Sequence, residues 1–255
     1  MKQLFSIFVL LLSVFGAAAD TKSVDAANAD YDHELYKQAL TAYLAQEKTG
    51  EVSSDLYYNI GNTYYRLKDN THAILYYERA LLANPGNSDA RFNLDFVRQR
   101  AGIDQDAGSN ILLVWLDAAV NRLSSNTWAV IALVSFWLLL VAVGLYLWAG
   151  SNAWRKVGFF GGIVLLALFI ASLSSSLHNR NLAADRTAAI IVGSNPTLSV
   201  SPREPKDKSE VAFEVPAGSK VKIVDSVNNG KVVWLRVATL NDREAWIKKS
   251  DIEII

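Results

Sequence analysis

The 255-residue chain contains no cysteine, which excludes disulfides, thiolate metal sites, thiol catalysis and lipid attachment through cysteine. It has only three histidines, His33, His72 and His178, and no two of them have the spacing of metal ligands. Walker, dinucleotide-binding and G-x-S-x-G motifs are also absent. The sequence therefore predicts a protein that is not an enzyme, with no catalytic residues, no metal and no cofactor.

An excess of charge of one sign is lacking too, because 25 Lys and Arg residues balance 25 Asp and Glu residues. No basic surplus indicates a nucleic-acid partner, and no acidic tail indicates a solvating segment. Asp104 and Asp106 in the segment DQD could suggest calcium. The segment lacks the further oxygen ligands and the closing glutamate of a calcium loop, so we interpret it as part of a linker.

Long apolar runs are what the sequence does have, since 51% of its residues are hydrophobic. Residues 127–149 and 157–177 are both uncharged and long enough to cross a hydrocarbon core of about 30 Å, which predicts two transmembrane helices. A buried hairpin of a soluble protein is the alternative. Gly158, Gly161 and Gly162 begin the second run, and small residues let helices approach closely. They predict packing of the two spans, with docking of a foreign membrane helix as the alternative.

The start of the chain and the loop between the spans predict where the protein lies. Lys2, an apolar run and the residues GAAAD predict a signal peptide over 1–19, with a retained membrane anchor as the alternative. Arg155 and Lys156 are the only charge cluster between the spans, and positive residues in short loops stay cytoplasmic. Both flanking regions would then lie on the periplasmic side of the inner membrane.

The composition of the chain before and after the main helical repeats predicts a leader, a linker and an interfacial helix. Residues 20–30 are small and polar and predict a short leader at the start of the helical region, 20–103. Residues 104–126 predict a linker followed by an interfacial helix over 111–123, which has polar residues near one face and Trp115 on the other. An ordinary packed helix is the equally open alternative for 111–123.

The helical region carries a repeat with a period of 34 residues, which separates Ala39 from Ala73 and Tyr43 from Tyr77. Residues 54–87 resemble a complete tetratricopeptide repeat, with flanking units that are partial. Gly61 lies inside the first helix, where glycine costs about 1 kcal/mol relative to alanine. The repeat explains this glycine, because a small residue is needed where the two helices touch. The signature positions are Tyr57, Ile60, Gly61, Tyr64, Ala73, Tyr77, Ala80 and Pro85.

The resemblance implies a concave groove, lined by first helices, that binds a peptide of a partner protein. Asn62 and Asn93 occupy places where such repeats hold a peptide backbone, whereas Tyr58 stands where carboxylate-binding members have lysine. A solvated polar face with structural asparagines is the alternative. The expected groove residues are Tyr58, Asn59, Asn62, Tyr65, Arg66, Phe92 and Asn93.

The C-terminal region, 186–255, changes to short alternating runs separated by turn residues, which predicts a small antiparallel all-β barrel or sandwich. The segment NNG, 228–230, predicts a hairpin turn. The runs FEVPAGSKVKIV, WLRV and EAWIKKSDIEII resemble the bacterial SH3-like domain, although Ala245 replaces its usual glycine. That resemblance implies binding of peptides or cell-wall fragments. Trp234 and Trp246 are core residues on one interpretation and ligand-contacting residues on the other.

The whole order predicts a multidomain fold: signal peptide, α-helical tetratricopeptide-repeat domain, two transmembrane helices and a small all-β SH3-like barrel. This order resembles the E-type proteins of the Bacteroides aerotolerance (Bat) family. The resemblance implies membrane partners with von Willebrand A domains, a MoxR-type ATPase nearby and a role in oxygen or stress tolerance. We expect a periplasmic adaptor that assembles an envelope complex and binds no nucleic acid. A sensor that binds peptidoglycan and an assembly chaperone for exported proteins are the alternatives.

Overall fold

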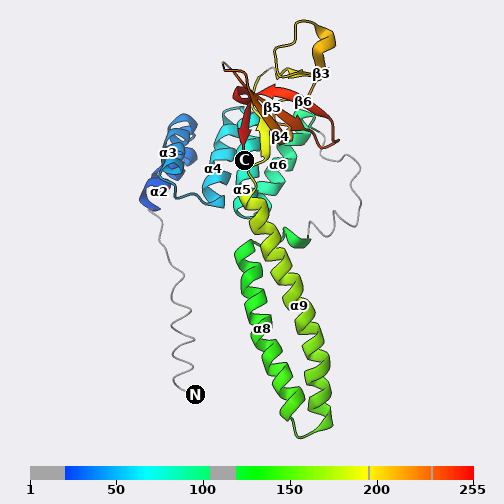
Figure 1. Ribbon diagram of the computed structural model, residues 1–255. Coiled ribbons are helices and arrows are strands. Elements are labelled where there is room, and N and C mark those ends of the chain that lie inside the picture. Colours follow the sequence, from blue (N-terminus) through cyan, green and yellow to red (C-terminus); the bar gives the residue numbers. More distant parts are fainter. Residues whose placement is uncertain (1–20, 104–118, 195, 231) are drawn as a thin grey trace. The chain divides into compact units, whose positions relative to one another are not determined.

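The computed structural model in Figure 1 describes residues 21–103, 119–194, 196–230 and 232–255. The predicted signal peptide, Asp104, Asp106 and residues 111–118 of the expected interfacial helix lie outside the described residues. The chain divides into two compact units, Met1–Val52 and Ser53–Ile255, which we take in turn.

The first unit contains the helices α2 (Thr21–Asp32) and α3 (Tyr36–Lys48). The predicted leader over 20–30 is therefore wrong, because small polar residues also form a helix when one face packs against a neighbour. The hydroxyl of buried Tyr43 on α3 donates to Asn28 Oδ1 on α2, at 2.6 Å. Burial, together with nearby Tyr31 and acidic residues, raises the pKa of Tyr43 to about 12, so the hydroxyl keeps its proton.

The second unit begins with three helices, α4 (Ser54–Arg66), α5 (Asn70–Ala83) and α6 (Ser88–Ala101). Each starts at a capping residue whose side chain accepts the backbone N–H three positions later, which satisfies a donor that the first helical turn leaves free. α6 ends at Gly102, whose φ of 65° is in the left-handed region that favours glycine. The capping residues are Ser53, Asp69 and Asn87.

Helices α4 and α5 repeat the contact seen between α2 and α3. The hydroxyl of Tyr77 donates to Asn62 Oδ1 at 2.7 Å, and both residues lie 34 positions after their counterparts in the first unit. Gly61 faces the same ring, because a Cβ there would lie 2.7 Å from two ring carbons of Tyr77. The predicted role of Gly61 in close helix packing is confirmed.

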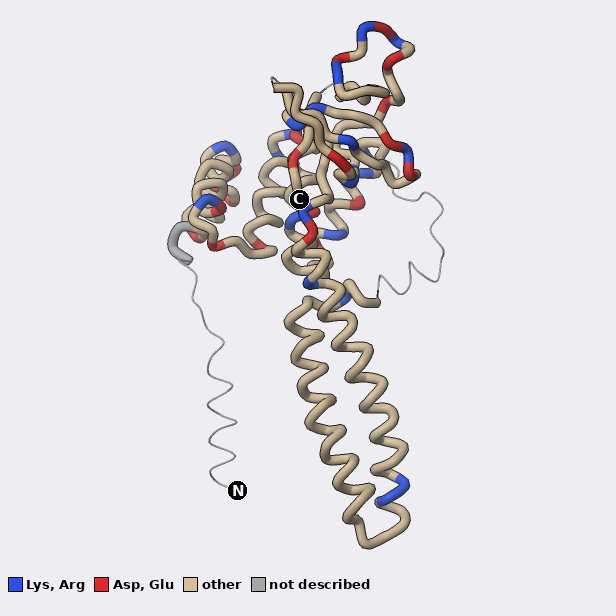
Figure 2. The backbone as a smooth tube through the Cα atoms, viewed as in Figure 1, with Lys and Arg blue, Asp and Glu red and all other residues tan. Residues whose placement is uncertain are grey.

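Helices α8 (Ser125–Trp148) and α9 (Asn152–Ala184) form an antiparallel hairpin (Figure 1), and both are long and apolar enough to cross a membrane. Only 17% and 11% of their most apolar windows are buried, so they are not packed inside a soluble core. Figure 2 shows no acidic residue along the hairpin and positive residues near its connecting turn. Helix α9 extends beyond the range 157–177 that the sequence predicts for the second span.

Helices α8 and α9 approach closely at a glycine near their turn and are hydrogen-bonded through serines at their other end. A Cβ on Gly158 would lie 2.6 Å from the carbonyl oxygen of Ala142, so only glycine permits this approach. Gly161, by contrast, has nothing within 4 Å of its Cβ position. At the other end, the hydroxyls of Ser125 and Ser176 each donate to the other residue's carbonyl oxygen at 3.0 Å.

The C-terminal region forms one antiparallel seven-stranded sheet with the order β3-β2-β6-β5-β4-β1-β7. Its predicted NNG turn lies between β4 and β5, where Asn229 N–H donates to the Val232 carbonyl. The SH3-like all-β fold, the helical repeats and the two apolar helices confirm the predicted fold class. The strands are β1 (Ala188–Ile191), β2 (Leu198–Ser199), β3 (Val211–Phe213), β4 (Lys220–Asn228), β5 (Val233–Ala238), β6 (Glu244–Lys248) and β7 (Ile252–Ile254), with the 3-10 turns η1 (Lys208–Glu210) and η2 (Lys249–Asp251).

One buried apolar cluster forms the core of this sheet. Successive side chains of a strand point to opposite faces, and the side chains on the inner face make up the cluster. Ala245 belongs to the cluster and is 3% exposed, so the residue that replaces the family's glycine points inward. The cluster consists of Ala189, Ile191, Leu198, Val221, Leu235, Val237, Ala245, Ile247 and Ile252.

Candidate functional site

The two asparagines of the predicted groove contact each other. Asn93 Nδ2 on α6 donates to Asn62 Oδ1 on α4 at 2.9 Å, and Asn62 Oδ1 also accepts the Tyr77 hydroxyl. Asn93 Nδ2 lies 3.5 Å from the hydroxyl oxygen of Tyr58. The Asn62 carboxamide oxygen thus joins three helices, which favours a structural role for this residue.

The exposed part of the same face is aromatic. The rings of Tyr65 on α4 and Phe96 on α6 meet edge to face, with centroids 6.1 Å apart. Arg100 contacts both residues, since its guanidinium donates to the Tyr65 hydroxyl at 3.1 Å and lies 5.2 Å from the Phe96 ring centroid. Phe92 is 71% exposed and Phe96 40% exposed, both large fractions for phenylalanine. We call Tyr58, Tyr65, Phe92, Phe96 and Arg100 the aromatic face.

Sequence reasoning missed two members of the aromatic face, Phe96 and Arg100. The signal was present, because these residues follow Phe92 at intervals of four and therefore lie on the same side of α6. Of the other predicted groove residues, Asn59 is half-buried and Arg66 is exposed at the end of α4.

The two tryptophans of the β-domain both lie outside its main apolar cluster. Along β5, Leu235 and Val237 belong to the cluster, so Trp234 and Arg236 point to the opposite face. Trp246 is the cross-strand partner of Arg236 and is only half-buried, with the guanidinium 6.0 Å from its ring centroid. Trp246 is therefore the more accessible of the two predicted residues, because Trp234 is only 4% exposed.

Charges surround Trp246 but are largely paired. Arg236 lies 3.5 Å from Asp225 and 3.4 Å from Glu244, and Lys248 pairs with Glu204 of the loop before η1. A ligand of this face would meet an indole ring beside two basic and three acidic side chains.

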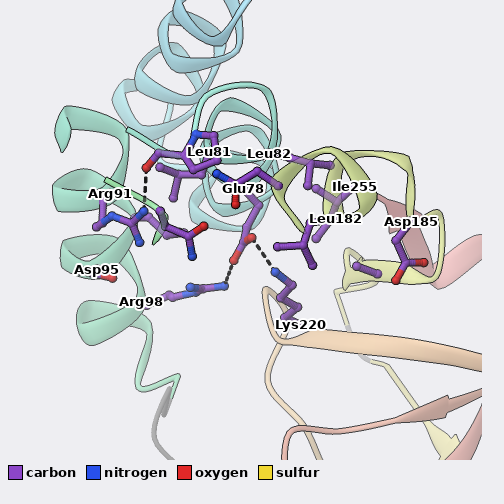
Figure 3. Close-up of a pocket in the computed structure, with 15 residues that line it drawn as sticks. Glu78, Leu81, Leu82, Arg91, Asp95, Arg98, Leu182, Asp185, Lys220 and Ile255 are labelled. Carbon is purple, nitrogen blue, oxygen red and sulfur yellow. Dashed lines mark hydrogen bonds and ion pairs between the residues drawn. The ribbon is translucent and has the colours of Figure 1, made fainter. Parts of the chain in front are cut away.

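A buried ion cluster joins the β-domain to the helical repeat. Glu78 on α5 is 7% exposed and pairs with Arg98 on α6 and with Lys220 on β4, whose Nζ lies at 2.9 Å (Figure 3). Burial alone would raise the pKa of the Glu78 carboxyl, but Lys220 and Arg98 outweigh burial and lower the pKa below its ordinary value. The carboxylate therefore remains charged between its two partners.

Two further contacts complete this junction. Arg79 donates to the Ile254 carbonyl at 3.0 Å and lies 3.3 Å from the Glu253 carboxylate. Gly218, with φ +91°, leaves no room for a Cβ, which would lie 2.9 Å from Ile74 and Ile103 side chains. Helix α5 thus carries the Tyr77 contact with α4 and also docks the β-domain. No local pattern indicates this docking in the sequence.

Comparison with protein-family models supports both modules. The Tetratricopeptide repeat model matches residues 54–87, and the Bacterial SH3 domain model matches residues 203–253. A search of curated proteins gave no match. The chain therefore carries a tetratricopeptide repeat and a bacterial SH3 domain, two modules that fit binding of proteins or of cell wall.

Proposed function

We propose that this protein is a membrane-anchored adaptor that binds a partner protein through the aromatic face. The exposure of Phe92, at 71%, beside Tyr65, Phe96 and Arg100 is the observation that supports it. Exposed apolar groups gathered on one face mark interaction surfaces, and aromatic residues with arginine are enriched where partners bind. The proposal includes no catalytic step.

The hairpin supplies the anchor in this proposal. At its open end the start of α8 meets α9 through Ser125 and Ser176, which agrees with a pair of spans that returns to its starting side. Arg155 and Lys156 lie at the start of α9, and positive residues in short loops favour the cytoplasmic side, which supports a cytoplasmic turn in this proposal. The repeats and the SH3-like domain then lie in the periplasm, with the hairpin in the inner membrane.

The resemblance to E-type Bat proteins supplies the proposed partners. Membrane proteins with von Willebrand A domains would bind the aromatic face, and the assembly would serve oxygen or stress tolerance. Two binding modules on one anchor raise the effective concentration for a partner with two contact sites.

Crosslinking in intact cells tests the adaptor. A photoreactive amino acid at Phe92 should form a crosslink to one or two membrane proteins, identified by mass spectrometry. The same amino acid at exposed Ala83 on α5 is the control and should not form it. Crosslinks equal to those of the control, or crosslinks to lipid alone, would rule out the aromatic face as the partner site. Crosslinks to many different exported chains would favour the chaperone instead.

A cell-wall sensor is the second candidate, because the matched SH3 domain carries the half-buried Trp246 on an accessible face. The full chain in detergent should then sediment with isolated peptidoglycan, and Trp246→Ala should reduce the sedimented fraction. Equal sedimentation of both forms would assign the binding elsewhere. Absence of sedimentation of either form would contradict the cell-wall sensor and leave the adaptor as the proposed function.

A further inference from the structure

Two positive residues stand apart from any acidic residue at one end of the membrane hairpin. Arg155 and Lys156 lie near the start of α9 and are both exposed, and the sequence from 118 to 184 contains no Asp or Glu. Figure 2 shows this pair beside the turn between α8 and α9. The proposed function uses the two charges only to orient the hairpin, so what they bind is still to be assigned.

The Arg155 guanidinium is held at the turn by one of its nitrogens. Its Nε donates to the carbonyl oxygen of Ala149, directly after α8, at 3.1 Å. Among the described residues this is the one hydrogen bond that the side chain makes, so its two terminal nitrogens remain free for an anion. Such a pair of nitrogens matches two oxygens of a phosphate. The turn therefore presents an oriented phosphate-binding group beside a second positive charge.

Two tryptophans indicate the depth at which this pair lies in a membrane. Trp148 ends α8 and is 80% exposed, and Trp154 directly precedes Arg155 and is 59% exposed. An α-helix rises about 1.5 Å per residue, so Trp154 and Lys156 are only about 3 Å apart along α9. Tryptophans at the ends of membrane helices lie at the level of the lipid headgroups. The two positive side chains thus lie at the headgroups of the membrane that the hairpin is proposed to cross.

The apolar surface next to the pair distinguishes a lipid from other anions. Phe159 and Phe160 follow on α9 and are 48% and 64% exposed, so acyl chains have a surface to pack on. A free anion or an acidic protein would use the charges but not these side chains. A lipid with no net charge would bring its own positive group towards two positive residues, which repel it. Charge and apolar surface together favour a lipid whose headgroup has a net negative charge.

We propose that the turn of the hairpin binds an anionic phospholipid through its phosphate. The phosphate oxygens accept from the terminal nitrogens of Arg155, Lys156 supplies the second positive charge, and the acyl chains pack beside Phe159 and Phe160. Basic residues at the ends of membrane helices bind anionic headgroups in this way. The proposal rests on the membrane anchor of the proposed function and adds a lipid ligand to it.

Lipid binding by the purified full chain in a neutral detergent tests the proposal. Native mass spectrometry compares phosphatidylglycerol with phosphatidylcholine of the same acyl chains, and the natural chain should retain phosphatidylglycerol in preference. Arg155→Gln combined with Lys156→Gln should weaken phosphatidylglycerol binding at least about tenfold, because each positive residue near a lipid surface contributes to binding. Equal retention of the two lipids by the natural chain would overturn the proposal, whatever the variant does.

Arg180→Gln combined with Arg186→Gln is the matched control. Both residues are exposed, and the change removes the same charge at the other end of α9, where Asp185 lies between them in the sequence. This variant should retain phosphatidylglycerol as the natural chain does, and circular dichroism checks that both variants keep their helices. An equal loss of binding in the two variants would show a general effect of charge and contradict a site at the turn.

Inorganic phosphate separates a lipid site from a site for free anions. Excess phosphate should displace no more phosphatidylglycerol than sodium chloride of the same ionic strength, because it cannot replace the contacts of the acyl chains. Greater displacement by phosphate would overturn the lipid as the ligand. All of these measurements are made in detergent, so they do not depend on the side of the membrane on which the turn lies in cells. Failure here would leave the aromatic-face crosslink unaffected, so the two proposals fail independently.

Discussion

At the scale of single residues, Gly61 shows packing outweighing helix propensity. Alanine would improve the propensity of α4 by about 1 kcal/mol, but its Cβ would lie 2.7 Å from the Tyr77 ring. That ring cannot move easily, because it is 1% exposed and its hydroxyl is bonded to Asn62. Overpacking costs about 1–3 kcal/mol, so Gly61→Ala should destabilise the repeat. We expect a lower thermal midpoint and faster hydrogen exchange in α4 and α5.

Gly161 provides the matched control for this prediction. It also lies inside a helix, but nothing lies within 4 Å of its Cβ position. Gly161→Ala should leave the thermal midpoint unchanged or raise it, because only the propensity term remains. Equal effects of the two substitutions would contradict the role given to Tyr77.

His72 and Asp69 form a pH-sensitive pair at the start of α5. The side-chain hydrogen bond to Asp69, at 2.7 Å, raises the pKa of His72 above its ordinary 6.5, although burial opposes the shift. For Asp69, burial would raise the pKa, but the hydrogen bonds from His72 outweigh it and lower the pKa below 3.8. Nearby Glu253 also raises the His72 pKa and Arg79 lowers it.

The sign of the pH dependence follows from these directions. The His72 contribution to stability is complete below pH 6.5 and is lost as pH rises through its raised pKa. The Asp69 contribution is complete above pH 3.8 and is lost as pH falls through its lowered pKa. An NMR titration of the full chain should find His72 titrating above 6.5. Asp69→Asn, which keeps a good capping residue, should return it toward 6.5. A titration at or below 6.5 with Asp69 present would be incompatible with the pair.

At the scale of elements, the buried carboxylate of Glu78 holds β4 against α5 and α6. Glu78→Gln keeps the shape but leaves Arg98 and Lys220 without their shared countercharge. Breaking a buried pair costs about 3–5 kcal/mol, and we expect about 3 kcal/mol because Lys220 is 39% exposed. Hydrogen exchange in β1 and β4 should increase, and the thermal midpoint should fall.

An exposed pair serves as the control for Glu78→Gln. Glu204 is 73% exposed and pairs with Lys248, so Glu204→Gln should change exchange very little. Unchanged exchange in β4 of Glu78→Gln would show that the ion cluster does not dock the β-domain.

Local patterns explain which elements could be predicted from the sequence. The 34-residue period identifies the contact of Gly61 with Tyr77, because both ends of that contact lie within one repeat. Charge-free runs likewise identify α8 and α9, since length and composition are properties of a single segment. The predicted leader failed because α2 is a weakly patterned helix that depends on packing against α3.

Contacts between distant segments explain what could not be predicted. Glu78 and Lys220 are 142 positions apart, and Asn179 reaches back 59 positions to Val120. Neither pair leaves a periodic signal in the sequence. The same limit applies to the asparagines of the predicted groove, because the contact of Asn62 with Asn93 appears only once three helices are packed.

At the scale of the whole molecule, the proposed adaptor has both binding modules on the external side of a membrane. The hairpin is compatible with this topology, because a chain that crosses twice returns to its starting side. Since the sequence contains no cysteine, single cysteines can report the side of each position without background labelling.

Labelling of single-cysteine variants in spheroplasts with a membrane-impermeant maleimide tests this claim most directly. Phe92→Cys reports the repeats, Leu240→Cys the β-domain and Ala153→Cys the turn between the spans, and all three positions are exposed. We predict labelling at 92 and 240 in intact spheroplasts, and labelling at 153 only after the membrane is permeabilised. Labelling at 153 in intact spheroplasts, or different results at 92 and 240, would contradict the adaptor as proposed.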